Sequence, residues 1–235
     1  MKNEKILLII PAYNEEESIV NTIESIEQFK RSVKLPFQLD YVVVNDGSTD
    51  LTPLLVLSKG VKLIDLRINL GLTGGFMAGM KYAYRQGYDS VIQFDADGQH
   101  LPDYIPAMVK EADSGANVVI GSRFVTEKKP NSLRMLGSVL ISFAIKITTG
   151  KTINDPTSGL RLFDRKAIQF YVKNYNMTPE PETVSYLIKK GFITKEVQVK
   201  MQDRLVGESY LNLKRSIQYM IRVVISILIL QPFRK

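Results

Sequence analysis

The chain has 235 residues, 45% hydrophobic and 23% charged, which is enough to build the core of one large α/β domain or two small ones. It contains no cysteine, which excludes a disulfide framework, a thiolate metal site and a cysteine nucleophile, and which fits a reducing cytoplasm. The formal net charge is +7; residues 189–235 hold ten Lys/Arg and three Asp/Glu, whereas residues 1–188 hold 21 of each. This basic C-terminal fifth predicts contact with an anionic surface: a membrane, a nucleic acid or another protein.

Strands and helices are predicted to alternate along the first half of the chain. The apolar run before Pro11 is too short for a signal peptide and too polar in its flanks for a membrane anchor. Apolar runs that end in polar loops predict strands within residues 4–14, 39–50, 61–69, 88–100 and 116–124. Helical spacing of apolar residues predicts helices within residues 15–30, 73–87 and 102–115. This alternation is typical of an α/β fold with a largely parallel sheet.

The pattern changes after residue 124. Helices are predicted within 129–150 and 179–192, and the Gly/Pro-punctuated segment 154–168 predicts a loop, a strand and then a helix. The last segment, "SIQYMIRVVISILILQPFRK", is apolar but carries Arg222 and is shorter than the about 20 apolar residues of a membrane span. It predicts a helix lying in a membrane surface, with Lys214, Arg215, Arg234 and Lys235 near anionic lipids. A helix packed on its own domain or in an oligomer interface is the alternative.

Two carboxylates one residue apart end the strand in "QFDADGQH". Asp95 and Asp97 would share one side of an extended chain, where two like charges repel unless a cation lies between them. Polar loops also end the strands at "PAYNEE", "NDGSTD" and "GSRF"; each loop alone is most often a turn or a helix cap. Together they would gather at the carboxyl edge of the sheet, where ligands bind in open α/β folds. Carboxylate ligands without cysteine favour Mg²⁺ or Mn²⁺, shared with the phosphates of a nucleoside diphosphate.

The order of the motifs resembles the family 2 glycosyltransferases of the GT-A fold, and most closely the polyprenyl-phosphate sugar transferases of the dolichol-phosphate mannose synthase type. The motifs are "PAYNEEESI", "VVVNDGSTD", "NLGLTGGFMAG", "QFDADGQH", "GSRF", "DPTSGLR" and "DRLVGES". The resemblance implies a Rossmann-like catalytic domain over residues 1–212, with a mostly parallel sheet flanked by helices. A C-terminal amphipathic or apolar helix over residues 213–235 would follow it.

The resemblance also assigns site residues, position by position. Asp95 and Asp97 would be catalytic and, with Gln99, would hold the metal and the donor diphosphate. Arg123 and Arg134 would also be catalytic and, with Ser138, would bind an acceptor phosphate. The nucleotide-binding residues would be Pro11, Ala12, Tyr13, Glu15, Asp46 (to the base), Gly75, Ala96 and Arg204. Tyr210 stands where the family usually has lysine, so either Lys200 or Lys214 substitutes or the diphosphate clamp is weaker.

The function that the resemblance implies is inverting, metal-dependent sugar transfer from a nucleotide sugar to a polyprenyl phosphate for cell-envelope glycans. UDP-glucose or UDP-N-acetylglucosamine is favoured, and GDP-mannose stays open. A phosphate acceptor is already anionic at pH 7, so the only histidine, His100, need not act as a base and is expected in a hydrogen bond beside the metal or in the loop. The enzyme would lie in the cytoplasm on the inner face of the membrane, with a small membrane partner or a second copy of the chain as further partners.

Three alternatives remain from the sequence. A family 2 enzyme that glycosylates a hydroxyl would need a carboxylate base, for which Glu180 or Glu182 is available. A catalytically dead nucleotide-binding assembly protein would not need the intact Asp95/Asp97 pair. Nucleic-acid binding is disfavoured because the basic C-terminus has no stripe of cations interleaved with aromatic residues.

Overall fold

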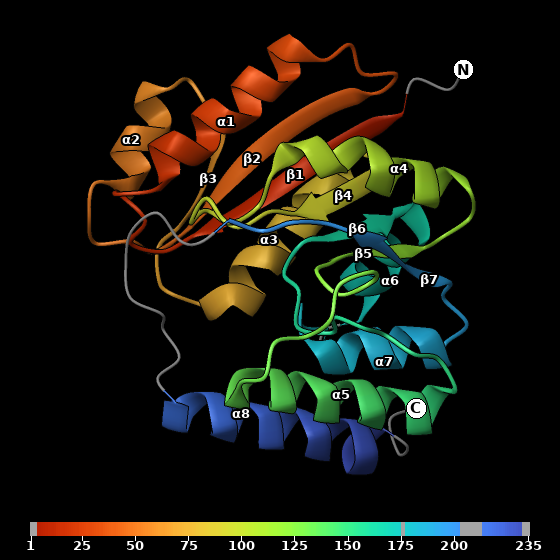
Figure 1. The fold of residues 1–235 in the computed structure, drawn as a ribbon. Helices are drawn as coiled ribbons and strands as arrows, with labels where there is room; N and C mark the ends of the chain where they lie inside the picture. The colour runs from red at the N-terminus through yellow and green to blue at the C-terminus, as the bar shows by residue number, and fades with distance from the viewer. Residues whose placement is uncertain (1–3, 175–176, 203–212, 232–235) are drawn as a thin grey trace.

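A mostly parallel sheet crosses the molecule in the computed structural model, which describes residues 4–174, 177–202 and 213–231 (Figure 1). Within these residues the strand order is β3-β2-β1-β4-β6-β5-β7. The strands are β1 (Lys5–Ala12), β2 (Gln38–Asp46), β3 (Leu63–Leu66), β4 (Ser90–Gln93), β5 (Val118–Ser122), β6 (Arg161–Asp164) and β7 (Thr194–Gln198). The predicted α/β class and mostly parallel sheet are confirmed.

One strand of this sheet runs against the others. Strand β6 is antiparallel to both of its neighbours, β4 and β5, whereas the other pairings are parallel. Because β6 reverses the direction twice, β1, β2, β4 and β5 all point the same way. Their carboxyl ends therefore lie along one edge of the sheet, as the sequence predicts.

Helices cover both faces of the sheet (Figure 1). They are α1 (Ile19–Ser32), α2 (Thr52–Ser58), α3 (Gly71–Gln86), α4 (Ile105–Asp113), α5 (Leu133–Thr149), α6 (Arg165–Lys173), α7 (Pro181–Lys189) and α8 (Leu213–Ile225). A short 3₁₀ turn (Pro102–Tyr104) precedes α4, and a π turn (Ser226–Leu230) extends α8. Helix α2 and strand β7 are not predicted from the sequence: α2 has only seven residues, and β7 has polar residues and is half-buried along its length.

Side chains of β1 separate the core into two halves. Ile6, Leu8 and Ile10 are buried with residues of α1, α2 and α4, whereas Leu7 and Ile9 are buried with residues of α3, α5, α6, α7 and α8. Successive side chains point to opposite faces of a strand, so a strand buried on both faces reads as the continuous apolar run seen at residues 6–10.

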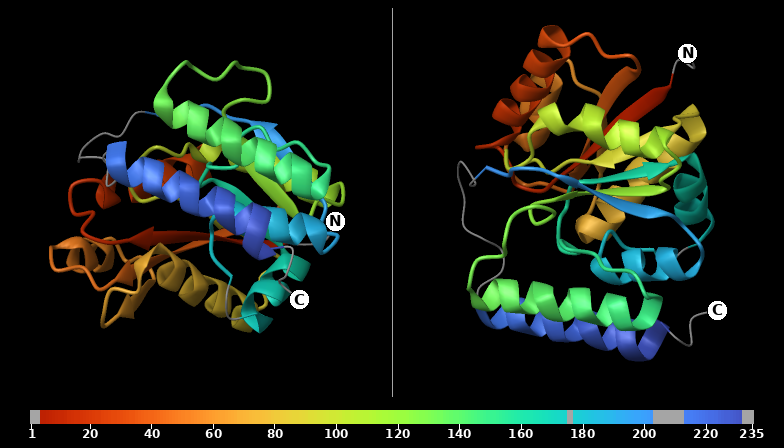
Figure 2. Two further views of the ribbon diagram at one scale, coloured as in Figure 1. Left: turned by 90° about the horizontal axis from the view of Figure 1, so that it is seen from below. Right: turned by 45° about the vertical axis from the view of Figure 1, so that its right-hand side comes forward.

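Helices α5 and α8 lie side by side at one end of the molecule, beyond α7 (Figures 1 and 2). Val223 and Ile227 are buried in the same core cluster as Ile141 and Ile145 of α5. One face of the C-terminal helix thus packs on its own domain, which is the alternative left open by the sequence. Within the described part of the chain, none of the helices has the length and apolar character needed to traverse a bilayer.

Candidate active site

A cavity of about 390 Å³ opens at the carboxyl ends of β1, β2 and β4. Eight predicted nucleotide or metal residues line it: Pro11, Ala12, Tyr13, Glu15, Asp46, Asp95, Ala96 and Asp97. Asn69, Gly71 and Leu72, at the entry to α3, complete the lining. The positive end of the helix dipole of α3 therefore faces a cavity whose side chains include several acids.

Asp95 and Asp97 both reach this cavity, although their surroundings differ. Asp97 is buried, and its Oδ1 accepts the backbone N–H of Gln99 at 3.1 Å. Asp95 is half-exposed; its backbone N–H donates to Nδ1 of the buried His100 at 2.9 Å, and Nε2 of His100 lies 3.4 Å from Oδ2 of Asp95. The histidine therefore holds Asp95 in place, which agrees with the predicted loop role.

Gln99, the third predicted metal residue, is not among the residues that line the cavity. Its carbonyl accepts the backbone N–H of Gln202, and its Nε2 lies 3.5 Å from the carbonyl oxygen of Gln202. Gly98 has φ of 77°, a left-handed conformation, so the alternation of an extended chain stops before Gln99. Asp95 and Asp97 thus reach the cavity, whereas Gln99, the third predicted metal residue, does not line it.

Asp46 links the ends of β2 and α3. It is buried, and its Oδ1 accepts the backbone N–H of Leu70 at 2.8 Å. Gly75, one turn into α3, lies against Pro11 and Asp46: a Cβ at this position would meet their Cβ atoms at 3.7 and 3.9 Å. These contacts hold the start of α3 against the cavity.

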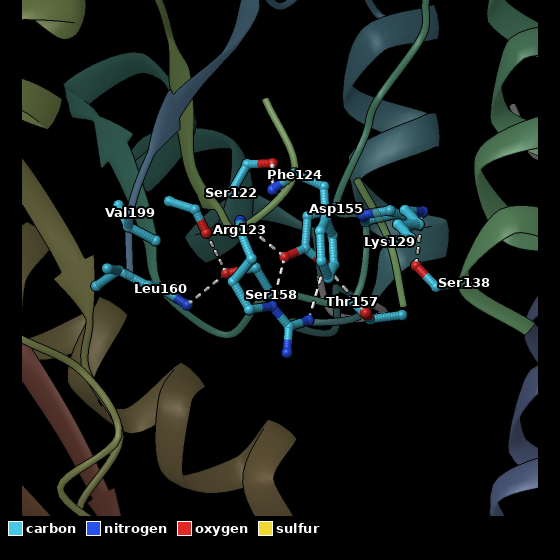
Figure 3. Close-up of polar contacts among 12 residues, drawn as sticks. Ser122, Arg123, Phe124, Lys129, Ser138, Asp155, Thr157, Ser158, Leu160 and Val199 are labelled. Atoms are coloured by element: carbon cyan, nitrogen blue, oxygen red, sulfur yellow. Dashed lines mark hydrogen bonds and ion pairs between the residues drawn. The ribbon is translucent and has the colours of Figure 1, made fainter. Parts of the chain in front are cut away.

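Arg123 directly follows β5 and forms a bidentate ion pair with the fully buried Asp155 (Figure 3). Nε of Arg123 lies 2.7 Å from Oδ2 and Nη2 lies 3.0 Å from Oδ1. The backbone N–H of Arg123 donates to Oδ2 as well. The pair orients the guanidinium, and among the described residues no hydrogen bond engages Nη1.

Ser138, a predicted acceptor-phosphate residue, is buried on α5 and accepts a hydrogen bond from Nζ of Lys129 at 3.0 Å (Figure 3). Lys129 is not among the site residues predicted from the sequence. Arg134 lies in the first turn of α5, but its side chain is outside the part of the structure that is described, and Arg204 is wholly outside it.

The segment 155–160 connects the cation side of the site to the acid side. Asp155 at its start holds Arg123, and Gly159 lies against Asp95: a Cβ on Gly159 would be 2.8 Å from Oδ2 of Asp95. Ser158 donates to the carbonyl of Gly121, which fixes the segment to β5. One ordered segment therefore sets both Arg123 and the space around Asp95.

Four acids line the cavity, but in the described residues they are not grouped so as to enclose a metal ion by themselves. No group of three or more His, Asp or Glu side chains with ligand geometry occurs in the ranges the structure describes. Asp95 and Asp97 offer hard oxygen donors, which suit Mg²⁺ or Mn²⁺ when waters and phosphate oxygens complete the coordination. The residues fit an ion that binds together with a diphosphate.

A second cavity, of about 640 Å³, lies between α3, α7 and α8. Its lining includes Glu180 and Glu182 at the start of α7, Arg222 of α8, and Thr73 of α3. Gly71 and Leu72 line the first cavity, so the first turn of α3 contributes to both. Burial raises the pKa of Glu182, and Glu180 adds to the effect, whereas Arg222 and Arg161 oppose it.

Several residues of the site are not assigned from the sequence. Asn69 and Leu72 lie in the motif "NLGLTGGFMAG", where only Gly75 is assigned. Lys129 lies in the segment "TEKKPNS" before α5, in which nothing distinguishes it from Lys128. Asp155 is visible as an acid in "DPTSGLR", but its pairing with Arg123 depends on the fold.

Comparison with known proteins adds a family. The model of "Glycosyl transferase family 2" matches residues 7–171. An undecaprenyl-phosphate mannosyltransferase of Micrococcus luteus is 31% identical over 234 residues, covering 90% of this chain and 93% of that protein. A UDP-N-acetylglucosamine–dolichyl-phosphate N-acetylglucosaminyltransferase of Methanococcus voltae is 30% identical over 190 residues, covering 72% of this chain and 73% of that protein.

Solved structures show the same fold. Glucosyl-3-phosphoglycerate synthase of Mycobacterium tuberculosis, in complex with Mn²⁺ and UDP-glucose, superposes with a TM-score of 0.66 at 18% identity, covering 97% of this chain and 79% of that one. The likeness supports a GT-A architecture for the sheet and its helices. By its family match and its relatives, the chain belongs to glycosyl transferase family 2 and is a glycosyltransferase.

Proposed function

We propose that this enzyme transfers a sugar from a nucleoside-diphosphate sugar to a polyprenyl phosphate, with inversion at the anomeric carbon. The donor we favour is UDP-glucose or UDP-N-acetylglucosamine, with GDP-mannose as the competitor. Residues 1–212 would form the catalytic domain, and residues 213–235 a helix that associates with the cytoplasmic face of the membrane, where the lipid product would serve cell-envelope glycan synthesis.

The observation that carries the proposal is the segment 155–160, which serves an acid pair and a cation at once. Gly159 abuts Asp95 on the side expected for the donor diphosphate, and Asp155 orients Arg123 on the side expected for a second phosphate. A site for a hydroxyl acceptor needs no such cation. Relatives in Micrococcus luteus and Methanococcus voltae carry names of undecaprenyl-phosphate and dolichyl-phosphate transferases, which supports a lipid phosphate acceptor.

The reaction needs no strong base in this arrangement. An anionic oxygen of the lipid phosphate attacks the anomeric carbon opposite the diphosphate; the new C–O bond forms as the bond to the diphosphate breaks and its electron pair leaves with the nucleoside diphosphate. Arg123 binds the acceptor phosphate, as a guanidinium does well. Asp95 and Asp97 would hold a divalent ion, which when bound neutralises the charge on the departing diphosphate.

The test is direct. Purified enzyme is incubated with labelled UDP-glucose, UDP-N-acetylglucosamine or GDP-mannose and with undecaprenyl phosphate, in Mn²⁺ or Mg²⁺ or in EDTA. We expect one donor to label the lipid, with loss in EDTA and recovery on adding metal, and an anomeric configuration opposite to that of the donor. Absence of labelled lipid with all three donors contradicts the proposal.

A second candidate follows from the second cavity. Glu182 has its pKa raised by burial, as general bases often do, and it lies beside the start of α3, so transfer to a sugar hydroxyl with Glu182 as base is the competing reaction. Glu182→Gln distinguishes the two: it removes the base for a hydroxyl acceptor and would abolish that transfer, whereas transfer to undecaprenyl phosphate should persist.

A further inference from the structure

Lys129 is a half-buried cation whose hydrogen-bond partners are neutral. Its Nζ donates to Oγ of Ser138 at 3.0 Å (Figure 3). It also lies 3.4 Å from Oγ of Ser142, one helical turn further along α5. In the described ranges of the chain no carboxylate lies within ion-pair distance of it. The two hydroxyls accept from two of its three N–H donors but leave its charge uncompensated.

A second cation lies close to Lys129. The ring of Phe124 has Cζ of Arg123 5.1 Å from its centroid and Nζ of Lys129 5.6 Å from it. The ring faces both cations, and the two belong to one loop that leads from β5 to α5. The guanidinium and the ammonium are thus gathered around one aromatic side chain.

The nearby carboxylates are already committed. Asp155 is bidentate with Arg123. Glu196 accepts the backbone N–H groups of Asn154 and Asp155 and the side-chain amide of Asn154. Burial lowers the pKa of Lys129, and Arg123 adds to the effect, whereas Asp155 and Glu196 oppose it without reversing it. A half-buried positive charge that its surroundings do not neutralise is the character of an anion-binding side chain.

We propose that Lys129 is a ligand of the acceptor phosphate, acting together with Arg123 and Ser138. The inference rests on the proposed function, because it takes the acceptor to be a lipid phosphate. On binding, the ammonium exchanges a hydroxyl partner for a phosphate oxygen, and Nη1 of Arg123 is available to a second oxygen. Because its charge rather than its shape is used, Lys129 sets the preference for a phosphorylated lipid over the corresponding alcohol.

The chain supplies a matched control. Lys128 precedes Lys129, has the same charge and is exposed. Binding of geranyl phosphate and of geraniol is measured by calorimetry for the wild type, Lys129→Gln, Lys129→Arg and Lys128→Gln. For geranyl phosphate we expect a loss of about tenfold or more in Lys129→Gln, as for a lost charge-assisted hydrogen bond. Lys129→Arg should recover part of this affinity, and Lys128→Gln should match the wild type.

Further readouts separate phosphate binding from a structural role. Geraniol should bind all four proteins equally, and with undecaprenyl phosphate Lys129→Gln should raise the acceptor KM while the KM for the nucleotide sugar is unchanged. If Lys129→Gln binds geranyl phosphate as tightly as the wild type, or if Lys128→Gln loses as much affinity, Lys129 is not a phosphate ligand. The proposed function is unaffected by either result. If the wild type binds geraniol as tightly as geranyl phosphate, the proposal of a phosphate acceptor is contradicted, and so is the proposed role of Lys129.

Discussion

One carboxylate oxygen of Asp95 has both His100 and Gly159 as close neighbours. His100 is within 3.4 Å of Oδ2 on one side, and Gly159 leaves room for the same oxygen on the other. The φ of Gly159 is outside the left-handed region, so its backbone conformation tolerates a side chain. A side chain here would therefore act only by filling the space beside Asp95.

Gly159→Ala should therefore move the carboxylate without unfolding the protein. Its Cβ would lie 2.8 Å from Oδ2 of Asp95, so the carboxylate must rotate away from the position that we propose for metal binding. We expect the transfer rate at limiting Mn²⁺ to fall by about 10- to 100-fold, as for a misplaced reacting group. Higher Mn²⁺ should restore part of the rate. A Mn²⁺ titration of initial rates checks this, with UDP binding in EDTA as the control that should not change; unaltered metal dependence would contradict it.

Glu182 makes a prediction about pH and stability. Burial raises its pKa above the ordinary 4.5, and its Oε2 is buried without a hydrogen-bond partner among the described residues. A carboxyl with a raised pKa in the folded state contributes stability below about pH 4.5, and that contribution is lost as the pH rises through the folded-state pKa. Ionisation of Glu182 at pH 8 thus lowers the free energy of unfolding, whereas a side chain that stays neutral would not lower it.

Glu182→Gln should for this reason raise the thermal midpoint at pH 8 by about 2 °C or more, and by less at pH 4. Gln keeps the size and polarity of the side chain but cannot ionise. Thermal unfolding of both proteins at pH 4 and pH 8 measures the difference. A gain that is the same at both pH values would assign the effect to packing and not to the charge.

At the scale of elements, the adjacent helices α5 and α8 both expose apolar side chains. Two stripes of exposed apolar side chains run along the helices, which lie side by side in both views of Figure 2. They are Leu136, Val139, Leu140, Phe143 and Ile147 on α5, and Ile221, Ile225, Leu228 and Ile229 on α8 and its π turn. Exposed apolar side chains on two adjacent helices are expected at a membrane or partner interface.

Leu228→Asp with Ile229→Asp should weaken attachment to vesicles that contain anionic lipids. Both side chains are exposed, so charge at these positions disturbs the surface and not the core. We expect membrane partition in a sedimentation assay to fall by about tenfold or more, because two apolar side chains would no longer enter the lipid. The matched control is Leu54→Asp with Leu57→Asp, the same change on exposed apolar residues of α2, far from α8 in Figure 1. Equal partition of the two double variants would mean that α8 does not meet the lipid.

Elements were predictable where burial imposes a period on the sequence. Strand β1 is buried on both faces and α1 on one, so the apolar run at residues 6–10 and the spacing of Ile19, Ile23 and Ile26 were sufficient signals. Strand β7 lies at the edge of the sheet and is half-buried, and its sequence, "TKEVQ", has no such period. The antiparallel direction of β6 is set by its neighbours across the sheet and not by its own residues.

At the scale of the whole molecule, the positions of the acidic side chains of the candidate site could be predicted from the sequence better than the positions of its basic side chains. The acids follow strands that share a direction, so topology alone brings Asp46, Asp95 and Asp97 to one edge. Lys129 reaches Ser138 because the loop after β5 folds back over α5, and no pattern in the sequence encodes that return. The left-handed Gly98 likewise diverts Gln99 from the row that an extended chain would give.

The acids that the fold gathers in the cavity at the carboxyl ends of the strands predict how metal ion and nucleotide bind. Two carboxylates are a weak site for a divalent ion, and the residues that line the cavity include acids but no positively charged side chain to meet a diphosphate without an ion. Ion and nucleotide should therefore bind together, because the ion supplies positive charge to the diphosphate and the diphosphate supplies oxygen ligands to the ion. We expect UDP with Mn²⁺ to raise the thermal midpoint by about 5–10 °C at concentrations near 100 times Kd, and either one alone by about 2 °C or less.

Asp97→Asn should abolish this cooperative shift while preserving the fold, because the amide oxygen can still accept the backbone N–H of Gln99 that Oδ1 of Asp97 accepts. Asp103→Asn, which removes an exposed acid in the 3₁₀ turn before α4, is the matched control and should behave as the wild type. Repeating the measurement with GDP identifies the base, since only the accepted nucleotide should show the cooperative shift. Shifts that are simply additive in the wild type, or a full shift in Asp97→Asn, would mean that the acids of this cavity do not hold an ion against the diphosphate.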